Sequence, residues 1–413
     1  MKVSQLFTKT SKTAPADEVA KNAQLLIRAG FVYKEMAGVY AYLPLGKRVL
    51  DNIIQIVREE MDAVGGNEIS LTALQQQETW QASGRWDDAA MDIWFKTKLA
   101  NGSELGLAPT HEEPLTRLMK GYIASYKDLP VYPYQFQIKF RNELRSKSGL
   151  MRGREFWMKD LYSFSKDVAE HEAFYEKITE AYHTIYARLG IGDRTYKTFA
   201  SGGSFSKYSH EFQTLSAAGE DTIYVHEGKK LAINSEVYTD DVLADLGIAR
   251  EELVEKKAVE VGNIFTLGTR FSDALGLAYT DSNGESKSVF MGSYGIGPSR
   301  IMGLIAELFA DEKGLVWPEA IAPARVYLVQ IGDDVSDNAQ QLYDRLMGAG
   351  IETLWDDRNA RPGEKFADAD LYGIPHRVVV SAKTAMQDKV EYKARTSDES
   401  GLLTVDELLD RLG

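Results

Sequence analysis

The chain contains no cysteine among its 413 residues. This absence excludes disulfide bonds, a catalytic thiol, and any zinc or iron–sulfur site that needs thiolate ligands. The sequence also lacks an uninterrupted apolar run of the ~20 residues that span a bilayer. Residues 1–19 lack the apolar core of a secretion signal. We therefore expect a cytoplasmic protein without a membrane segment.

Two familiar nucleotide-binding signatures are missing as well. No segment matches the P-loop pattern GxxxxGK[ST], and the glycines at 292, 295 and 297 do not follow the dinucleotide fingerprint GxGxxG. The net charge of −13 argues against indiscriminate nucleic-acid binding, although it permits a local basic groove. A nucleotide site in this chain must therefore be built in another way.

The composition that is present describes an ordinary globular protein of two or three domains, with 44% hydrophobic and 10% aromatic residues. Pro318 and Pro323 mark a boundary. Beyond it, strand and helix patterns alternate over about 90 residues, which indicates a compact α/β domain without internal repeats. From Ala324 onward this part has 11 Lys and Arg against 17 Asp and Glu.

Residues 134–164 form the most informative stretch. Their period-two alternation predicts two long antiparallel strands, joined by a basic loop that carries Lys147 and Arg152. Arg141 and Glu143 fall on the polar face of the first strand, and Phe156 and Met158 share a face of the second. A guanidinium suits a phosphate, a carboxylate suits an amine, and a ring can stack on a base. The pattern alone fits a solvated sheet face equally well.

The remaining segments give a coarse map of the chain. Apolar spacing predicts helices over 17–29, 45–64, 112–119 and 168–189, and strands over 67–74 and 258–267. The Gly/Ser-rich run 196–212 is interpreted as a loop, either a flap over a ligand or a tight turn. Residues 228–258 are interpreted as short helices and linker. The acids Glu112 and Glu113 open a helix, where they either serve the helix dipole or bind an ammonium group.

The sequence resembles the bacterial-type prolyl-tRNA synthetases, a family of class II aminoacyl-tRNA synthetases, over essentially its whole length. The run LPLGKRVLDNIIQIVREEMDAVGGNEI, at about 45–74, resembles the family's motif 1. FRNELRSKSGLMRGREFWMKDLYSF, within 134–164, resembles motif 2, and GSYGIGPSR, within 289–308, resembles motif 3. LAPTHEE resembles the proline-binding segment, and DDRNARPGEKFADADLYGIPHR resembles the anticodon-binding domain.

The resemblance implies an α+β fold: a catalytic domain (1–320) with an antiparallel sheet flanked by helices, and an α/β anticodon-binding domain (321–413). It implies a homodimer that activates L-proline with ATP and Mg²⁺, without zinc, and transfers the prolyl group to tRNA(Pro). Many bacterial relatives carry a large editing domain between motifs 2 and 3, where this chain has only the stretch 228–258. The resemblance therefore implies that mischarged alanyl-tRNA(Pro) is not edited in cis.

The resemblance also assigns residues to roles. Arg141 bridges the amino-acid carboxylate and the α-phosphate, Arg300 is the second catalytic residue, and Glu260 helps to place Mg²⁺. The implied ATP site comprises Arg141, Glu143, Arg152, Phe156, Glu260, Asn263 and Arg300. The implied proline site comprises Thr110, Glu112, Arg141, Met158 and Phe265. The implied anticodon contacts are Asp357, Arg358, Arg361 and Lys365.

Three departures from the family pattern, and two other readings of the sequence, accompany this assignment. Thr72 stands where motif 1 usually has proline, Asn263 stands where bacterial relatives commonly have histidine, and the 196–212 run contains extra residues. A sibling class II enzyme is one alternative, but the threonyl family uses a zinc-ligating cysteine and the seryl family a coiled-coil arm. A non-catalytic accessory subunit is the other, but such proteins tend to lose the motif arginines, whereas Arg141 and Arg300 are present.

Overall fold

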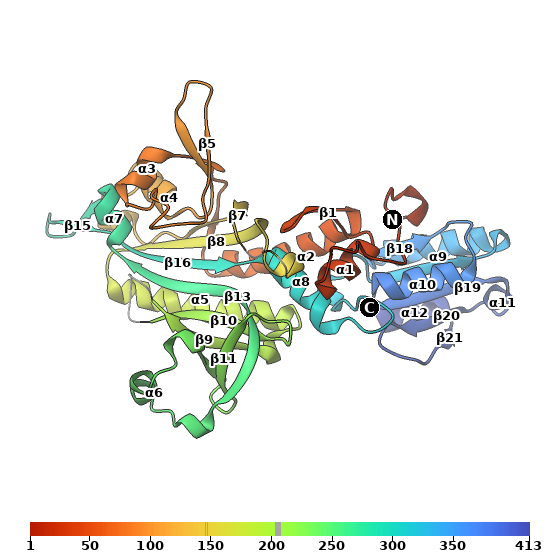
Figure 1. Ribbon diagram of the computed structural model, residues 1–413. Coiled ribbons are helices and arrows are strands. Elements are labelled where there is room, and N and C mark those ends of the chain that lie inside the picture. The colour runs from red at the N-terminus through yellow and green to blue at the C-terminus, as the bar shows by residue number, and fades with distance from the viewer. Residues whose placement is uncertain (145, 147, 203–207) are drawn as a thin grey trace. The chain divides into compact units, whose positions relative to one another are not determined.

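The computed structural model in Figure 1 describes residues 1–144, 146, 148–202 and 208–413. The chain divides into two compact units. The smaller unit comprises Met1–Met36, Tyr40–Ile53 and Met302–Gly413, and the larger comprises Ala37–Val39 and Ile54–Ile301. This grouping places N-terminal residues with the C-terminal segment, unlike the expected division at residue 320, which stays a prediction. The units are described separately below.

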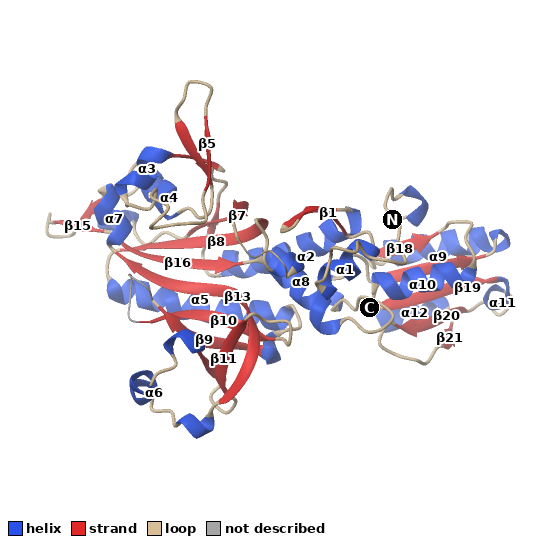
Figure 2. Ribbon diagram, viewed as in Figure 1, coloured by secondary structure: helices blue, strands red, loops and turns tan. Residues whose placement is uncertain are grey.

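A nine-stranded sheet organises the larger unit (Figure 2), with the strand order β10-β9-β12-β11-β13-β16-β8-β7-β3. In chain order the strands are β3 (Asn67–Glu68), β7 (Pro133–Phe140), β8 (Glu155–Ser165), β9 (Thr195–Ser201), β10 (Tyr208–Leu215), β11 (Asp221–His226), β12 (Leu231–Asn234), β13 (Val254–Gly268) and β16 (Phe290–Ile296). Neighbouring strands are antiparallel, except that β12 pairs with β9 and β3 with β7 in parallel. The expected antiparallel sheet is confirmed.

The predicted hairpin over 134–164 is confirmed as β7 and β8. Gln137 lies opposite Met158 and Lys139 opposite Phe156, so the two polar faces form one surface of the sheet. That surface is not solvated, because Gln135, Lys139 and Asp160 are each at most 3% exposed. The alternative of a solvated sheet face is therefore wrong, and the polar groups of this surface must bind one another or a ligand.

Helix α5 (Val168–Arg188) covers the opposite face of the sheet (Figure 1). It begins where the Asp167 side chain accepts the Glu170 N–H, and its Tyr182 and Tyr186 rings contact the Phe212 ring of β10. The helix matches its predicted bounds to within one residue. Helix α2 (Pro44–Ala63) does so as well, ending before Gly65, whose φ of 91° suits glycine.

Two stretches contain strands that the sequence did not predict: the run 196–212, interpreted as a loop, and residues 228–258, interpreted as short helices and linker. The short helices of the second stretch are present, with α6 at Asp240–Leu246. Residues 196–212 supply β9 and β10; positions 203–207 of the expected flap lie outside the described residues. Within 228–258, β12 pairs with both β9 and β11. Earlier in the chain, β10 pairs with both β9 and β13. These pairings close a ring of five strands around Ile223, Val225 and Ala232. Pairing between distant segments, rather than local sequence, makes them strands.

The predicted strand 67–74 is wrong over most of its length. Only Asn67 and Glu68 pair in the nine-stranded sheet, and Leu74 already begins β4 of another sheet. Between them, the Leu71 N–H and C=O bond to the side chains of Gln135 and Gln137 instead of to a strand. The side-chain amides of two glutamines thus take the place of the backbone hydrogen bonds that a neighbouring strand would make. The first predicted helix is also shorter than expected, since α1 begins at Lys21 and ends at Arg28.

The smaller unit contains a five-stranded sheet with the order β18-β17-β19-β20-β21. Its strands are β17 (Val326–Ile331), β18 (Thr353–Asp356), β19 (His376–Ser381), β20 (Val390–Ala394) and β21 (Gly401–Leu403). Its helices are α9 (Ser336–Gly348), α10 (Pro362–Tyr372), α11 (Ala382–Ala385) and α12 (Val405–Leu412). The predicted alternation of strands and helices is confirmed, although α10 begins inside the loop expected to extend to Lys365.

The remaining elements complete the chain. They are β1 (Val32–Met36), β2 (Val39–Tyr42), β4 (Leu74–Gln76), α3 (Gln77–Ala82), β5 (Phe95–Lys98), β6 (Glu104–Leu107), α4 (Glu112–Met119), α6 (Asp240–Leu246), α7 (Arg270–Leu275), β14 (Ala278–Thr280), β15 (Ser286–Ser288) and α8 (Pro298–Phe309). None of the described helices is long and apolar enough to cross a membrane.

Candidate active site

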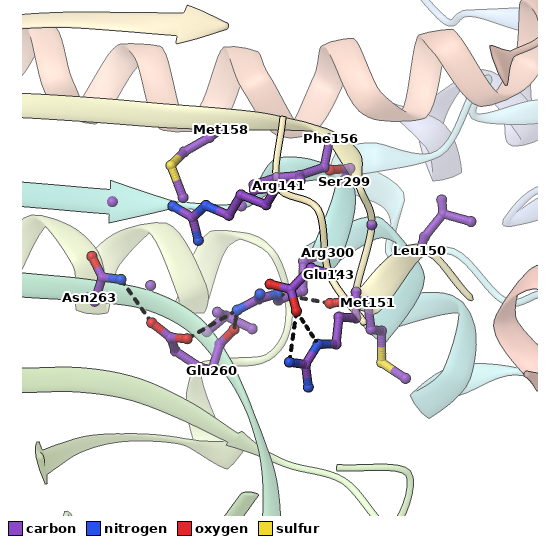
Figure 3. Close-up of a pocket in the computed structure, with 16 residues that line it drawn as sticks. Arg141, Glu143, Leu150, Met151, Phe156, Met158, Glu260, Asn263, Ser299 and Arg300 are labelled. Carbon is purple, nitrogen blue, oxygen red and sulfur yellow. Dashed lines mark hydrogen bonds and ion pairs between the residues drawn. The ribbon is translucent and has the colours of Figure 1, made fainter. Parts of the chain in front are cut away.

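A cavity in the larger unit is lined by β8, β13, β16, the start of α8 and the loop between β7 and β8 (Figure 3). Eight of its lining residues were predicted from the sequence: Arg141, Glu143, Arg152, Phe156, Met158, Glu260, Asn263 and Arg300. Gly295 leaves the space that the Asn263 amide occupies, because a Cβ there would lie 2.8 Å from its Oδ1. Strands far apart in sequence thus bring the predicted ATP residues together.

Arg141 makes few polar contacts for a charged side chain that lines a cavity. Its Nε donates to the Pro109 carbonyl at 3.3 Å, and its Cζ lies 5.3 Å from the centre of the Phe156 ring. No carboxylate among the described residues lies within ion-pair distance, and Figure 3 shows no dashed line from its guanidinium to the other residues drawn. Burial lowers the pKa of Arg141, and Arg300 lowers it further. The site therefore holds a cation ready for an anionic ligand.

Arg300, in contrast, is held firmly on the floor of the cavity. Its Nη1 donates to the Glu260 carbonyl at 2.7 Å and to the Glu260 Oε2 at 3.2 Å, and its Nε donates to the Met151 carbonyl at 2.9 Å. The Asn263 amide donates to the other Glu260 oxygen at 2.8 Å. An amide at position 263 therefore still supplies a donor that orients Glu260.

Glu143 and Arg152 bind each other across the loop between β7 and β8. The Arg152 Nη2 lies 2.8 Å from Glu143 Oε2, and its Nη1 lies 2.6 Å from Glu220 Oε2. These bonds to Glu143 raise the pKa of Arg152. The two predicted ligand-binding groups thus neutralise one another here, and a bound nucleotide would have to replace this contact.

Thr110 and Glu112 stand beside the cavity, at the start of α4. The Thr110 Oγ1 donates to Glu112 Oε2 at 2.6 Å, and its oxygen lies 3.3 Å from the Tyr162 hydroxyl. Pro109, the residue before Thr110, accepts the bond from Arg141. The predicted proline-binding segment therefore adjoins the predicted ATP residues. Phe265 packs into the apolar cluster that contains Tyr162 and does not line the cavity.

Arg85 was not predicted, but it contacts both acids of this segment. Its Nη1 lies 3.3 Å from Glu112 Oε2 and 3.1 Å from Glu113 Oε1. The pKa of Glu113 is raised to about 7, mainly by burial; Arg85 acts in the opposite direction, and the neighbouring Glu112 adds to the rise. Two carboxylates thus share one guanidinium. The GRW sequence around Arg85 has no periodic or motif signal that points to Glu112, so only the fold reveals the contact.

A second unpredicted group supports the same segment from beneath. His111 is fully buried; its Nε2 lies 3.0 Å from the Thr72 carbonyl and its Nδ1 lies 2.8 Å from Lys139 Nζ. The pKa of His111 is lowered to about 4, first by burial and then by Lys139, so the ring is neutral. Lys139 in turn pairs with Asp160 at 2.8 Å. At position 72 this contact uses only the backbone carbonyl, which threonine and proline both supply.

The predicted anticodon residues lie in the smaller unit and have unequal environments. Arg358 lies 2.7 Å from both Asp356 and Asp368, and Lys365 donates to the Gln330 and Asp356 carbonyls. Lys365 is only 3% exposed, so its expected role as an exposed donor is wrong. Asp357 accepts two bonds from Ser4. Arg361 is exposed, and no ion-pair partner for it is found among the described residues.

The acidic side chains do not form a ready-made metal centre. No group of three or more His, Asp and Glu residues that could hold a metal ion is found in the described part of the chain. Glu260 is the one lining carboxylate predicted as a metal ligand, and each of its oxygens already accepts one bond, from Asn263 and from Arg300. Such a donor set fits an ion that takes its other ligands from phosphates and water, as Mg²⁺ does.

Comparison with known proteins identifies the family. Residues 95–309 match the tRNA synthetase class II core domain (G, H, P, S and T), and residues 325–413 match the anticodon binding domain. The proline–tRNA ligase of Rhizorhabdus wittichii is 37% identical over 439 positions, with all of both chains covered. That of a Geobacillus species is 34% identical over 564 positions, covering 100% of this chain and 99% of its own.

Solved structures show the same fold at lower identity. The prolyl-tRNA synthetase of Cryptosporidium parvum complexed with L-proline and AMP has a TM-score of 0.76 at 18% identity, covering 95% of this chain and 73% of its own. That of Giardia lamblia in complex with prolyl-adenylate also has a TM-score of 0.76 at 18% identity, covering 93% and 74%. The chain therefore belongs to the proline–tRNA ligases, a family of class II aminoacyl-tRNA synthetases.

Proposed function

We propose that the cavity binds ATP and L-proline side by side and forms prolyl-adenylate. In this reaction a carboxylate oxygen of proline attacks the α-phosphorus of ATP, the bond from that phosphorus to the β-phosphate oxygen breaks, and pyrophosphate leaves. The prolyl group then passes to the terminal ribose hydroxyl of tRNA(Pro), and AMP leaves. No covalent bond to the protein is needed, so catalysis consists of positioning and neutralising charge.

One observation carries this proposal: the partly buried Arg141 guanidinium, which has no carboxylate partner among the described residues. A planar fork of donors can bind the proline carboxylate and the α-phosphate together, which aligns the two reacting groups. Phe156, whose ring lies beside this guanidinium, stacks on the adenine base. Glu143 accepts from the adenine amino group once it is released from Arg152.

The two other arginines bind the phosphates that leave. Arg300 is fixed by Glu260 and Met151, so its side chain reaches the cavity in a defined position. Arg152 turns from Glu143 and Glu220 toward the terminal phosphates. Glu260, oriented by Asn263, holds Mg²⁺ together with phosphate oxygens, and the bound ion offsets phosphate charge.

The proline ring is bound by the other half of the site. Thr110 and Glu112 receive its imino nitrogen, and Met158, which lines the cavity, gives apolar contact. Phe265 supports this half of the site from the apolar cluster that contains Tyr162. The Thr110–Glu112 bond and the Arg85 contact hold this carboxylate in place before proline arrives. Because this carboxylate is already held in place, less side-chain conformational entropy is lost when proline binds.

Four further features complete the proposal. The protein works in the cytoplasm as a homodimer, and Arg361 contributes to binding the anticodon of tRNA(Pro). It does not edit alanyl-tRNA(Pro) in cis. The alignment lengths support this last point, since the Geobacillus relative requires 564 positions to align with the 413 residues of this chain.

The decisive experiment is ATP–pyrophosphate exchange by the purified chain with each of the twenty amino acids. We expect exchange that depends on proline, with weaker exchange for alanine. Exchange that is strongest with another amino acid would contradict the proposed substrate, and no exchange with any would contradict the proposed reaction.

A further inference from the structure

The first sixteen residues differ in charge from the rest of the chain. They contain Lys2, Lys9 and Lys12 and no acidic residue, although the net charge of the whole chain is −13. Lys9 and Lys12 are exposed, and among the described residues no carboxylate lies within ion-pair distance of either. Phe7 is 76% exposed. Free cations beside an exposed ring suit a polyanion that carries stackable bases.

This N-terminal arm, residues 2–12, is fastened to the five-stranded sheet. Lys2 forms a parallel bridge with Trp355 of the edge strand β18, and the N-terminus lies beside β18 in Figure 1. Ser4 donates to Asp357 through its N–H at 3.0 Å and its hydroxyl at 2.6 Å. Thr10 donates to Asp368 at 2.6 Å. The Lys2 ammonium also helps to anchor the arm, since it donates to Gln340 and lies over the Trp355 ring. The ammonium groups of Lys9 and Lys12 take no part in these contacts and are left available.

The anchor lies next to the loop with the one exposed cation among the predicted anticodon contacts. Asp357 precedes Arg358 in that loop, and Arg361 opens α10 a few residues later. The whole segment 325–413 matches an anticodon binding domain. Ser4 already donates two hydrogen bonds to the Asp357 carboxylate. Asp357 can therefore contribute to RNA binding by holding the arm rather than by contacting a base.

We propose that the N-terminal arm is part of the tRNA-binding surface. Lys9 and Lys12 contact backbone phosphates of the anticodon stem-loop, Phe7 stacks on an unpaired base, and the Ser4–Asp357 contact keeps the arm in place. This inference rests on the proposed function, since the arm lies beside RNA only when the adjoining loop binds an anticodon. RNA readers favour single-stranded loops, where such bases are exposed.

The first test measures binding of the full-length protein to an RNA hairpin with a proline anticodon over a range of salt concentrations. A Lys9→Ala/Lys12→Ala double variant should lower the slope of log K against log salt by about 2, one for each phosphate contact. Phe7→Ala should weaken binding about tenfold, and Phe7→Leu should not restore it. Lys383→Ala, an exposed lysine on α11, is the matched control and should leave both quantities unchanged.

The second test separates anchoring from charge. Ser4→Ala and Asp357→Asn should both weaken hairpin binding at low salt, because either change weakens the Ser4–Asp357 contact that holds the arm while every lysine remains. If Asp357→Asn weakens binding and Ser4→Ala does not, Asp357 contacts RNA directly and the anchor is wrong. Binding by the lysine double variant equal to that of Lys383→Ala would overturn the inference.

The proposed function is checked in the same preparations. Proline-dependent pyrophosphate exchange without tRNA should be unchanged in every arm variant, because none touches the cavity. If the parent protein shows no exchange, the proposed reaction is contradicted. If exchange is normal and the arm variants bind RNA as the parent does, only the inference about the arm is contradicted.

Discussion

The nine-stranded and the five-stranded sheets both gather cationic side chains, but they use them differently. Beside the nine-stranded sheet, Arg141 is partly buried at a cavity and has no carboxylate partner among the described residues. In the five-stranded sheet, Arg358 pairs with two aspartates and Lys365 bonds to two backbone carbonyls. Both sets stand in motif-like runs of sequence. A buried cation left without a counterion is reserved for a ligand, whereas a saturated one serves the fold.

The strongest way to break this comparison is to remove the unpaired cation. Arg141→Ala should reduce proline-dependent pyrophosphate exchange by at least 10²- to 10³-fold, as expected for a preorganised donor to a charged reacting group. The free energy of unfolding should remain near that of the parent, since no ion pair is lost. Arg250→Ala, whose partner Asp240 is exposed, is the control. Exchange within tenfold of the parent would show that Arg141 has another role.

Arg358→Ala should give the opposite result. It leaves Asp356 and Asp368 without their cation, so the free energy of unfolding should fall by about 3 kcal/mol. This figure lies at the low end for a buried pair because the arginine side chain is 26% exposed. Proline activation at low temperature should be retained. Arg345→Ala removes an exposed pair with Asp406 and should change stability by no more than about 0.5 kcal/mol, as denaturant unfolding would measure.

A third variant examines the two acids that share Arg85. The pKa of Glu113 is raised to about 7 in the folded chain, above its ordinary value of 4.5. The folded state therefore binds an extra proton between pH 4.5 and 7, and its stability falls as the pH rises through this window. Glu113→Gln should match the parent at pH 5 and exceed it by about 2 kcal/mol at pH 8. A constant difference in unfolding free energy across this range would contradict the shared charge.

The anticodon contacts offer a smaller effect. Arg361→Ala should raise the KM for tRNA and weaken discrimination at an anticodon guanine by about 1–2 kcal/mol, without changing proline activation. Lys365→Ala should act through stability, since its ammonium is buried. Aminoacylation of wild-type and anticodon-substituted transcripts by both variants would distinguish the two residues. If Arg361→Ala and Lys365→Ala lost anticodon discrimination equally, the exposed and the buried cation would have the same role, which would contradict the comparison.

The last prediction is that the purified chain has no editing activity. A pocket for proline discriminates against the smaller alanine by only ~1–3 kcal/mol for each missing methylene group. Without editing in cis, the purified chain should leave alanyl-tRNA(Pro) intact at the uncatalysed rate of hydrolysis. Rapid release of alanine would reveal an editing site within these 413 residues.

Local pattern determined the elements that bury a regular face. Helices α2 and α5 and the β7–β8 hairpin follow the predicted bounds closely, because their apolar residues repeat with the period of the element. The residues that gather at the cavity were also named from the sequence, through the resemblance of motifs 2 and 3 to a known family. Motif resemblance assigned their types and order, and the strands that carry them then placed eight of them together.

The tertiary structure alone decided the features that depend on distant partners. Residues 228–258 contribute a strand because β9 and β11 lie on either side of β12. Arg85 binds Glu112, and Ser4 binds Asp357, across separations that no local period records. The sequence by itself determined the family, the main helices and the identity of the cavity residues. Only the packed chain decided which charges are saturated and which are left for a ligand, since pairing depends on distances that a linear sequence does not contain.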